Sequence, residues 1–255
     1  MIRWTYVFVD RPAPHADPAS AFWATVTGTR VGAPWGDRGE FRSLEPVGAD
    51  PCLVVQTVGV AGPAGSVHPD FAVDDPGAFA DRAVTLGATV VSRTPGLTVL
   101  RSPAGQPFCV VAWRGQRVRP DVVTDPRGGV SRADQVCLDV APDAFAAEVV
   151  FWAELTGWRS RADSLAEFHT VRPAGIDSPV QLLLQRLDEP RPASAHLDLA
   201  CTDIAATRDW HEECGAGFVA EYPEWSVMRD PSGAPYCLTG RDPWTGGGRA
   251  AGDGG

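Results

Sequence analysis

FWAELTG (residues 151–157) occurs a second time in altered form, as FWATVTG at residues 22–28, an offset of 129 residues. Four further blocks recur in the same order at nearly the same offset. They are HPDFAVDD from His68 with HLDLACTD from His196, VLRSPAGQPFCVV from Val99 with VMRDPSGAPYCLT from Val227, LVVQ from Leu53 with LLLQ from Leu182, and EFRSLEP from Glu40 with EFHTVRP from Glu167. Ordered repeats at one spacing indicate that the chain arose by duplication of a domain.

The duplication divides the chain into two units, which we call unit one (residues 1–114) and unit two (residues 133–241). Each unit has the size of an ordinary domain and is long enough to bury its own core. The stretch between them, residues 115–132, is polar, contains Pro and Gly, and lacks an apolar period, so it is predicted to be a linker. The Gly-rich residues 242–255 are expected to form a disordered tail.

Each unit contains the same order of elements twice, a strand followed by a helix and three strands. The first copy in unit one predicts a strand at 4–10, a helix at about 18–28, and strands near 29–34, 40–46 and 52–58. The second copy predicts a strand at 68–74, a helix at 75–87, and strands near 88–93, 97–101 and 107–113. Four aspartates precede the predicted helices and are expected to be N-caps, namely Asp10, Asp74, Asp139 and Asp203.

Composition narrows the class of partner. The net charge of −10 and the pI of about 4.9 argue against nucleic acid and anionic membranes, both of which attract basic surfaces. The N-terminal sequence lacks the apolar core of a signal peptide and no apolar run is long enough to span a membrane, so a cytoplasmic protein is expected. The six cysteines are scattered without a CxxC pair, which fits a reduced protein. Nine tryptophans are many for this length; some are expected to pack the core, and a Trp-rich chain can also line a cavity that binds an aromatic molecule.

These repeats resemble the vicinal oxygen chelate superfamily, which groups glyoxalases, bleomycin-resistance proteins and extradiol dioxygenases, and in particular its tandem glyoxalase-like proteins. The resemblance rests on the FW-x₃-TG helix ends, on the H-x-D strands from His68 and His196, and on SPAGQPFCVV and DPSGAPYCLT, which look like the family's DPxGNxxEL turn and final strand. It implies an α+β fold in which each unit is a pair of βαβββ motifs forming a cupped, partly open barrel. It also implies a protein that is a monomer of two fused domains or a homodimer.

The same resemblance assigns four inward positions in each unit, which hold a divalent metal in the family's metalloenzymes. In unit one they match Tyr6, Gln56, His68 and Cys109, and in unit two they match Gln135, Gln185, His196 and Cys237. Both positions that the family fills with glutamate are replaced, so the metal-binding and proton-transferring carboxylate is expected to be absent. No cofactor is expected, and the alternative is zinc, iron, nickel or manganese held in unit two by His196, Cys237, Gln135 and Gln185.

Several alternatives stay open for these residues. His68 and His196 are either catalytic and ligand-binding groups or inert, hydrogen-bonded structural histidines. Cys109 and Cys237 either pack in the core or face a cavity, and Trp225 is either a core residue or a cavity wall. The favoured hypothesis is binding of an aromatic small molecule without chemistry. The alternatives are a metal-dependent lyase, isomerase or dioxygenase, and metal-free catalysis with His196 as acid or base. If one unit serves only as a scaffold, Tyr6 predicts that it is unit one.

Overall fold

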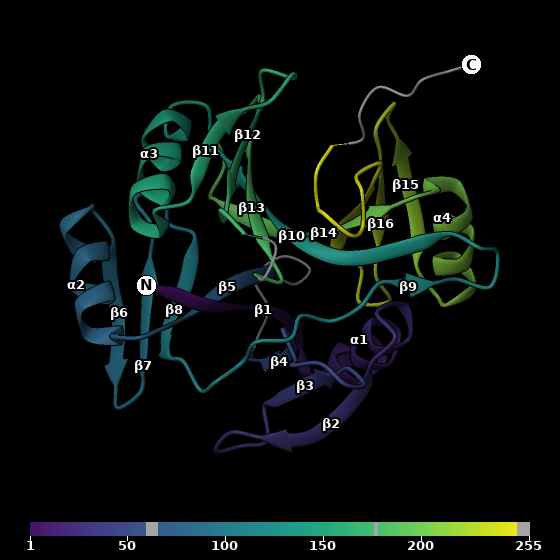
Figure 1. Cartoon of the computed structure of the whole chain (residues 1–255), viewed down its shortest axis with the longest axis horizontal. Helices are drawn as coiled ribbons and strands as arrows, with labels where there is room; N and C mark the ends of the chain where they lie inside the picture. The colour runs from purple at the N-terminus through teal and green to yellow at the C-terminus, as the bar shows by residue number, and fades with distance from the viewer. Residues whose placement is uncertain (60–65, 176–177, 249–255) are drawn as a thin grey trace.

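The computed structural model describes residues 1–59, 66–175 and 178–248, and within them each unit forms one open, mixed sheet with two helices (Figure 1). Unit one contains β1 (Ile2–Pro12), α1 (Ala13–Val26), β2 (Arg30–Trp35), β3 (Phe41–Glu45), β4 (Leu53–Val58), β5 (Ser66–Val73), α2 (Pro76–Thr85), β6 (Thr89–Thr94), β7 (Leu97–Arg101) and β8 (Pro107–Ala112). Unit two contains β10 (Val130–Val140), α3 (Phe145–Thr156), β11 (Arg159–Ala162), β12 (Phe168–Arg172), β13 (Gln181–Arg186), β14 (Ser194–Cys201), α4 (Ile204–Glu213), β15 (Gly217–Glu221), β16 (Trp225–Arg229) and β17 (Pro235–Thr239).

The two sheets have the same strand order, which confirms the predicted pair of βαβββ motifs in each unit. Unit one runs β2-β3-β4-β1-β5-β8-β7-β6 and unit two runs β11-β12-β13-β10-β14-β17-β16-β15. In each sheet the first strands of the two motifs, β1 with β5 and β10 with β14, pair antiparallel at the centre. The last strand of each motif pairs parallel with the first strand of that motif. The arrangement therefore brings the first and last strands of both motifs side by side.

The predicted linker and tail contain ordered structure. Within residues 115–132, β9 (Val123–Thr124) pairs with the start of β10, so the central strand of unit two begins before the expected boundary. Residues 242–248 form a turn whose Asp242 carboxylate accepts from the backbone N–H groups of Trp244 and Thr245. The expected disorder therefore does not extend to these residues, and 249–255 lie outside the described residues.

Three of the four expected N-caps are wrong. Strand β1 continues through Asp10 to Pro12, which precedes α1, and β10 continues through Asp139 to Val140, with Ala144 as the N-cap of α3. The side chains of Asp75 and Asp203 do cap α2 and α4 by accepting from Ala78 and Ala206. Asp74 is not a cap, since the helix begins one residue later than that expectation required. Asp10 and Asp139 are consequently free to act elsewhere in their sheets.

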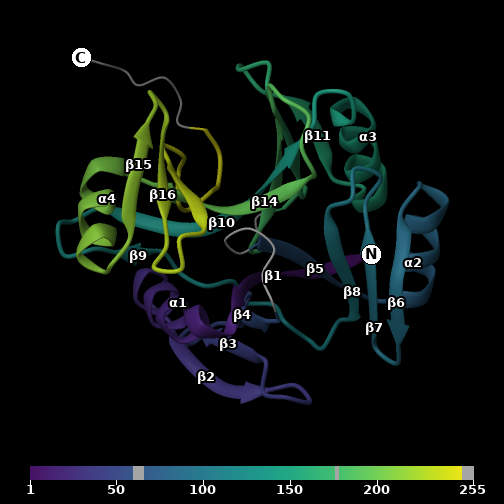
Figure 2. The same ribbon diagram turned by 180° about the vertical axis from the view of Figure 1, so that it is seen from behind.

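The duplicated FW motifs pack between the units. In Figures 1 and 2, α1 lies beside α4 and α3 lies beside α2, so each unit's first helix faces the other unit. The Trp152 ring packs on Phe108 of β8 with a centroid distance of 5.1 Å, and the Trp23 ring packs on Tyr236 of β17 at 5.2 Å. Trp23 and Trp152 are both fully buried. Burial of these aromatic rings at two pseudosymmetric contacts stabilises the pairing of the units.

A buried carboxylate of unit two accepts from the indole N–H in each of these contacts, across the units at Trp23 and within the same helix at Trp152. Trp23 Nε1 donates to Asp230 at 3.0 Å, and Asp230 also pairs with the buried Arg11 guanidinium at 2.6 Å. Trp152 Nε1 donates to Glu148 of its own helix at 2.8 Å, and Glu148 accepts from the backbone N–H of Ala104. Within the described residues no helix is both long and apolar enough to cross a membrane.

Candidate functional site

A cavity of about 1420 Å³ lies in the cup of unit two. Its lining side chains come from both motifs of this unit and include all five positions singled out there from the sequence, namely Gln135, Gln185, His196, Trp225 and Cys237. Residues of the C-terminal turn, among them Gly246 and Gly248, complete the wall. Gln181 Nε2 donates to the carbonyl of Gly246, so the turn is held against the cup.

The alternation of side chains along the central strands β10 and β14 directs polar residues toward this cavity. On β10, Val136, Leu138 and Val140 belong to the hydrophobic core. Because side chains alternate along a strand, Gln135, Cys137 and Asp139 face the opposite side. On β14 the same alternation places His196 and Asp198 on the cavity side, with Leu197 and Leu199 in the core. The register pairs Cys137 with His196 and Asp198 with Cys237, so these side chains converge.

His196 lies at the centre of the converging group. Its Nδ1 is 3.5 Å from Oδ2 of Asp139, and its Nε2 is 3.3 Å from Oδ1 of Asp198. The Cys237 sulfur is 3.5 Å from the same Nε2. The imidazole therefore lies between the carboxylates of Asp139 and Asp198, and the Cys237 thiol is close to Nε2, the nitrogen that faces Asp198.

The surroundings set the protonation of this group. Burial alone would lower the pKa of His196, but the neighbouring Cys137, Cys237 and Asp139 raise it well above its ordinary value. Burial also opposes ionisation of Asp139, yet His196, Ser194 and Arg191 lower the pKa of that carboxyl. Burial raises the pKa of Asp198 and of the Cys237 thiol. A protonated His196 paired with an ionised Asp139 can donate a hydrogen bond or a proton, which are the roles of an acid group.

The expected absence of a carboxylate is therefore wrong for unit two. The sequence comparison placed neutral residues at the family's glutamate positions, but Asp139 and Asp198 supply carboxylates from other inward positions of the same sheet. Asp139 was missed because it was assigned to a helix cap, and Asp198 because only the histidine of its H-x-D motif was singled out. The i, i+2, i+4 spacing of Gln135, Cys137 and Asp139 was the signal that could have identified this face.

The two predicted glutamines have different surroundings. Gln135 Nε2 donates to Oδ2 of Asp198 at 2.7 Å, and its Oε1 accepts from Gln181 at 3.0 Å. Gln135 thus positions Asp198 through a chain of buried amides. Gln185 is half-buried, and its Oε1 accepts from the Cys137 thiol at 3.8 Å. Gln185 is consequently the more accessible of the two to a molecule in the cavity.

Aromatic residues form one part of the cavity wall. The rings of Tyr222 and Trp225 are stacked with centroids 4.6 Å apart, and Phe168 meets Trp225 edge-on at 5.6 Å. Phe168 belongs to β12 and Trp225 to β16, so the two motifs meet at this contact. Trp225 is half-buried and lines the cavity. Of the two interpretations of this residue from the sequence, its position matches the cavity wall and not the core.

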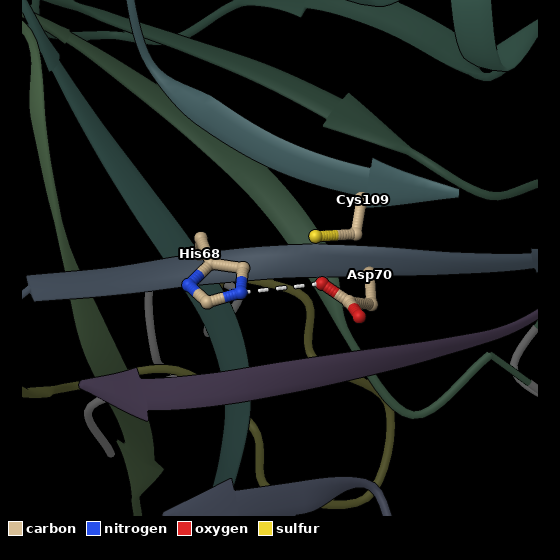
Figure 3. Close-up of side chains that lie close together, drawn as sticks. All are labelled: His68, Asp70 and Cys109. Carbon is tan, nitrogen blue, oxygen red and sulfur yellow. Dashed lines mark ion pairs between the residues drawn. The ribbon is translucent and has the colours of Figure 1, made fainter. Parts of the chain in front are cut away.

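Unit one contains a related cluster in a different setting. Figure 3 shows His68 and Asp70 on β5 with Cys109 on β8, and His68 Nε2 is 3.4 Å from the Asp70 carboxylate. His68 Nδ1 lies 2.8 Å from Asp10, and although burial opposes the charged form, Asp10 raises the pKa of His68 to about 9. Burial raises the pKa of Asp70 to about 6 and that of the Cys109 thiol.

The main difference between the two clusters is Phe8, which occupies the position in unit one that Cys137 occupies in unit two. Its ring stacks on His68 with centroids 5.2 Å apart, and Phe41 packs edge-on against it at 5.7 Å. Of the remaining predicted positions, Tyr6 lies in register with Asp70, and Gln56 lies beside Asp10. Aromatic rings thus cover the unit-one histidine, whereas the large cavity is lined by unit two.

The donor set in unit two fits a divalent metal. The ligand atoms of His196, Asp198 and Cys237 lie within 4.8 Å of one another, and Oδ1 of Asp198 is buried without a hydrogen-bond partner. Imidazole, carboxylate and thiolate are together the usual ligands of zinc. Cys137, Asp139 and His196 form a second group of the same size that shares the histidine.

The sequence profile of the glyoxalase-like domain matches residues 6–111 and again residues 135–239. The chain belongs to this family. Both copies of the glyoxalase-like domain cover the strands that carry the two histidine clusters. A search of curated protein sequences finds no significant match.

Several solved structures similar to this glyoxalase-like protein are dioxygenases. A halotolerant catechol dioxygenase aligns with a TM-score of 0.62 and 16% identity, over 96% of this chain and 90% of the other. The 2,2',3-trihydroxybiphenyl 1,2-dioxygenase of Sphingomonas wittichii strain RW1 aligns with a TM-score of 0.62 and 15% identity, over 94% and 90% of the two chains. The 2,3-dioxygenase LapB of Pseudomonas sp. KL28 gives a TM-score of 0.63 at 11% identity, over 93% and 92%. At these identities the likeness establishes the tandem vicinal oxygen chelate fold.

Proposed function

We propose that unit two binds a small molecule with an aromatic ring in its cavity. The observation that carries the proposal is that a single 1420 Å³ cavity has an aromatic wall at Trp225 and a buried polar cluster at His196. Ligand sites typically combine such an apolar surface with a few convergent polar groups. The similar dioxygenases are named for catechol and trihydroxybiphenyl, which are hydroxylated rings, and a hydroxylated ring fits both parts of this cavity.

Two groups of residues in the cavity would bind different parts of the ligand. Tyr222 and Trp225 would stack on the ring, as stacked aromatic pairs do in protein cores. Protonated His196 would donate to a ligand oxygen, while Gln185 offers an amide to a second polar edge.

Calorimetric titration of the full chain with naphthol tests this proposal. Replacing Trp225 by Leu, the residue type at the matching position Leu97, is expected to weaken binding about tenfold because the stacking surface is lost. Trp35→Ala is the matched control, since Trp35 is a half-exposed tryptophan of unit one that stacks on Phe41. Absence of binding, or equal affinity in wild type and Trp225→Leu, would contradict the proposal. Mass spectrometry of the recovered ligand separates simple binding from turnover.

A second candidate function is metal-dependent chemistry, favoured by the His196, Asp198 and Cys237 group. A metal held by these residues would supply Lewis-acid polarisation of a ligand oxygen. Both His196 and Cys237 must lose a proton before they can serve as ligands, so metal affinity is expected to rise with pH. Elemental analysis of chain purified without chelator, and the sulfur-to-metal absorption band after addition of cobalt, test the site without an activity assay. His196→Ala and Cys237→Ala should abolish the band. His68, Asp70 and Cys109 form a similar group in unit one, so each variant is also prepared with His68→Ala. A band that survives in Cys237→Ala on this background would contradict the assignment.

A further inference from the structure

The cavity wall formed by β11 and β12 carries three arginines. Arg159, Arg161 and Arg172 all line the cavity. Arg159 and Arg172 are direct partners in the antiparallel register, and Arg161, two residues further along β11, shares the face of Arg159. We call these three residues the arginine wall.

The arginine wall brings three like charges together on two neighbouring strands. Among the residues that the structure describes, no ion pair involves any of the three guanidinium groups, and their one hydrogen bond runs from Arg172 to the backbone carbonyl of Thr245. Like charges directly opposite each other destabilise a sheet. An unpaired cluster of three cations is also unexpected in a chain with a net charge of −10.

Unit one provides an internal comparison for this cluster. In unit one, Arg30 occupies the position of Arg159. Its partner across the strands is Glu45, which carries the opposite charge and occupies the position of Arg172. Gly32 stands at the position of Arg161. Relative to its duplicate, unit two therefore has arginine in place of an acid and of a glycine, and both differences add positive charge to the wall of the large cavity.

The opposite wall has a different character. Glu221 and Glu224 lie with Tyr222 and Trp225 on β15, β16 and their connection, and Glu221 pairs with Arg208. The nearest carboxylate to the arginine wall along the chain is Asp163, which accepts from Ser164 and Thr170. Cations thus line the cavity on β11 and β12, with Asp163 beside them, and Glu221 and Glu224 line it on β15 and the connection to β16.

The aromatic and cationic groups lie on neighbouring parts of the same cavity wall. Arg161 lies in register with Thr170, which is two residues from Phe168, and the Phe168 ring touches Trp225. From Arg161 the register continues through Thr170, Leu183 and Cys137 to His196, which is four strand spacings or about 19 Å along the curved sheet. The contact between Phe168 and Trp225 therefore places the aromatic wall next to β12, the strand that carries Arg172.

We propose that the arginine wall binds an oxyanion, a carboxylate or phosphate, carried by the aromatic ligand of unit two. The inference rests on the proposed function, since it names the class of molecule that the same cavity takes. Guanidinium groups bind both oxyanions through paired N–H donors, and the two solvent-facing arginines of β11 are free to rearrange around them.

The test compares ligands that share a naphthyl ring and differ in the charge of one substituent group. Naphthoate, naphthamide and naphthyl phosphate are titrated calorimetrically into the full chain at low and high salt. Naphthoate or naphthyl phosphate is expected to bind at least about tenfold more tightly than naphthamide, with the difference reduced by salt. The tighter of the two anions identifies the oxyanion. The double variant Arg161→Gly with Arg172→Glu, which installs the unit-one residues, should remove the preference and leave naphthamide binding unchanged. Arg30→Gln is the control in unit one, and the unfolding midpoint of each variant verifies its fold.

The outcomes separate the two proposals. Equal binding of naphthoate, naphthyl phosphate and naphthamide by the wild type would overturn the arginine wall and leave the aromatic cavity standing. A preference for anions that survives in the double variant would also overturn it. Failure of all three compounds to bind would count against the cavity itself, and with it the arginine wall.

Discussion

The ion pair between Arg11 and Asp230 is predicted to stabilise the association of the two units. The Arg11 guanidinium donates from Nε and Nη2 to Oδ2 of Asp230 at 2.9 and 2.6 Å, and both side chains are fully buried. Replacement of Asp230 by Asn preserves the size of the side chain but leaves a buried cation without its anion. The expected loss is about 3 kcal/mol in the free energy of unfolding, because breaking a buried pair from one side leaves an uncompensated charge.

The pseudosymmetric contact supplies the matched control. Glu148 accepts from Trp152 and Ala104 as Asp230 accepts from Trp23, but no cation in the described part of the chain pairs with it, and burial raises its pKa. Glu148→Gln therefore disturbs hydrogen bonds without exposing an unpaired charge, and we expect a loss of about 1 kcal/mol. The two substitutions together distinguish the contribution of the ion pair from that of the indole hydrogen bond.

Urea denaturation of wild type, Asp230→Asn, Arg11→Met and the double variant measures the coupling. Removal of both charges should restore about 2 kcal/mol relative to Asp230→Asn alone, since the double variant has no stranded cation. Equal losses in Asp230→Asn and Glu148→Gln, or a coupling energy below about 0.5 kcal/mol, would refute the reasoning.

Three further predictions concern the rest of the chain. His68 has a pKa of about 9 in the folded protein, above its ordinary 6.5, so its stabilising contribution is complete below pH 6.5 and is lost as the pH rises through 9. The wild type should therefore lose about 3 kcal/mol in the free energy of unfolding over this pH range, and His68→Gln should not show this loss. Disulfide-exchange labelling followed by peptide mass spectrometry should modify the half-buried Cys214 first, because the other five cysteines are buried; earlier labelling of Cys137 would contradict this order. Gly157→Ala should cost about 1 kcal/mol in thermal unfolding because Gly157 ends α3 at a φ of 68°, whereas Gly217→Ala, at an ordinary φ, should cost less.

Much of the fold could be predicted from the sequence. The repeat offset fixed the two units, and the predicted strands of unit one at 29–34, 52–58 and 107–113 overlap β2, β4 and β8 almost residue for residue. These elements were predictable because their signals are local, namely apolar periodicity and the glycines and prolines that punctuate it. The N-terminal ends of α1 and α3 were less predictable. Helix α1 begins after Pro12 and α3 begins after Ala144, and neither helix has a side-chain cap.

The candidate site was predictable only in part. His196 and Cys237 were identified because conspicuous repeat motifs surround them, and both line the cavity. Asp139 and Asp198 were not assigned to the site, because their proximity to His196 depends on the register of β10 against β14. Register is set by packing across the sheet and has no signature in the order of residues on a single strand.

The sequence by itself determined that the chain is duplicated, which elements each unit contains, and which histidines and cysteines recur in both. Only the tertiary structure decided that unit two holds the large cavity, that Phe8 covers the histidine of unit one, and that three arginines share one wall. The physical reason is that periodicity and turn chemistry act between neighbours in the chain. The cavity, by contrast, depends on which side chain each strand presents to strands that lie far away in sequence.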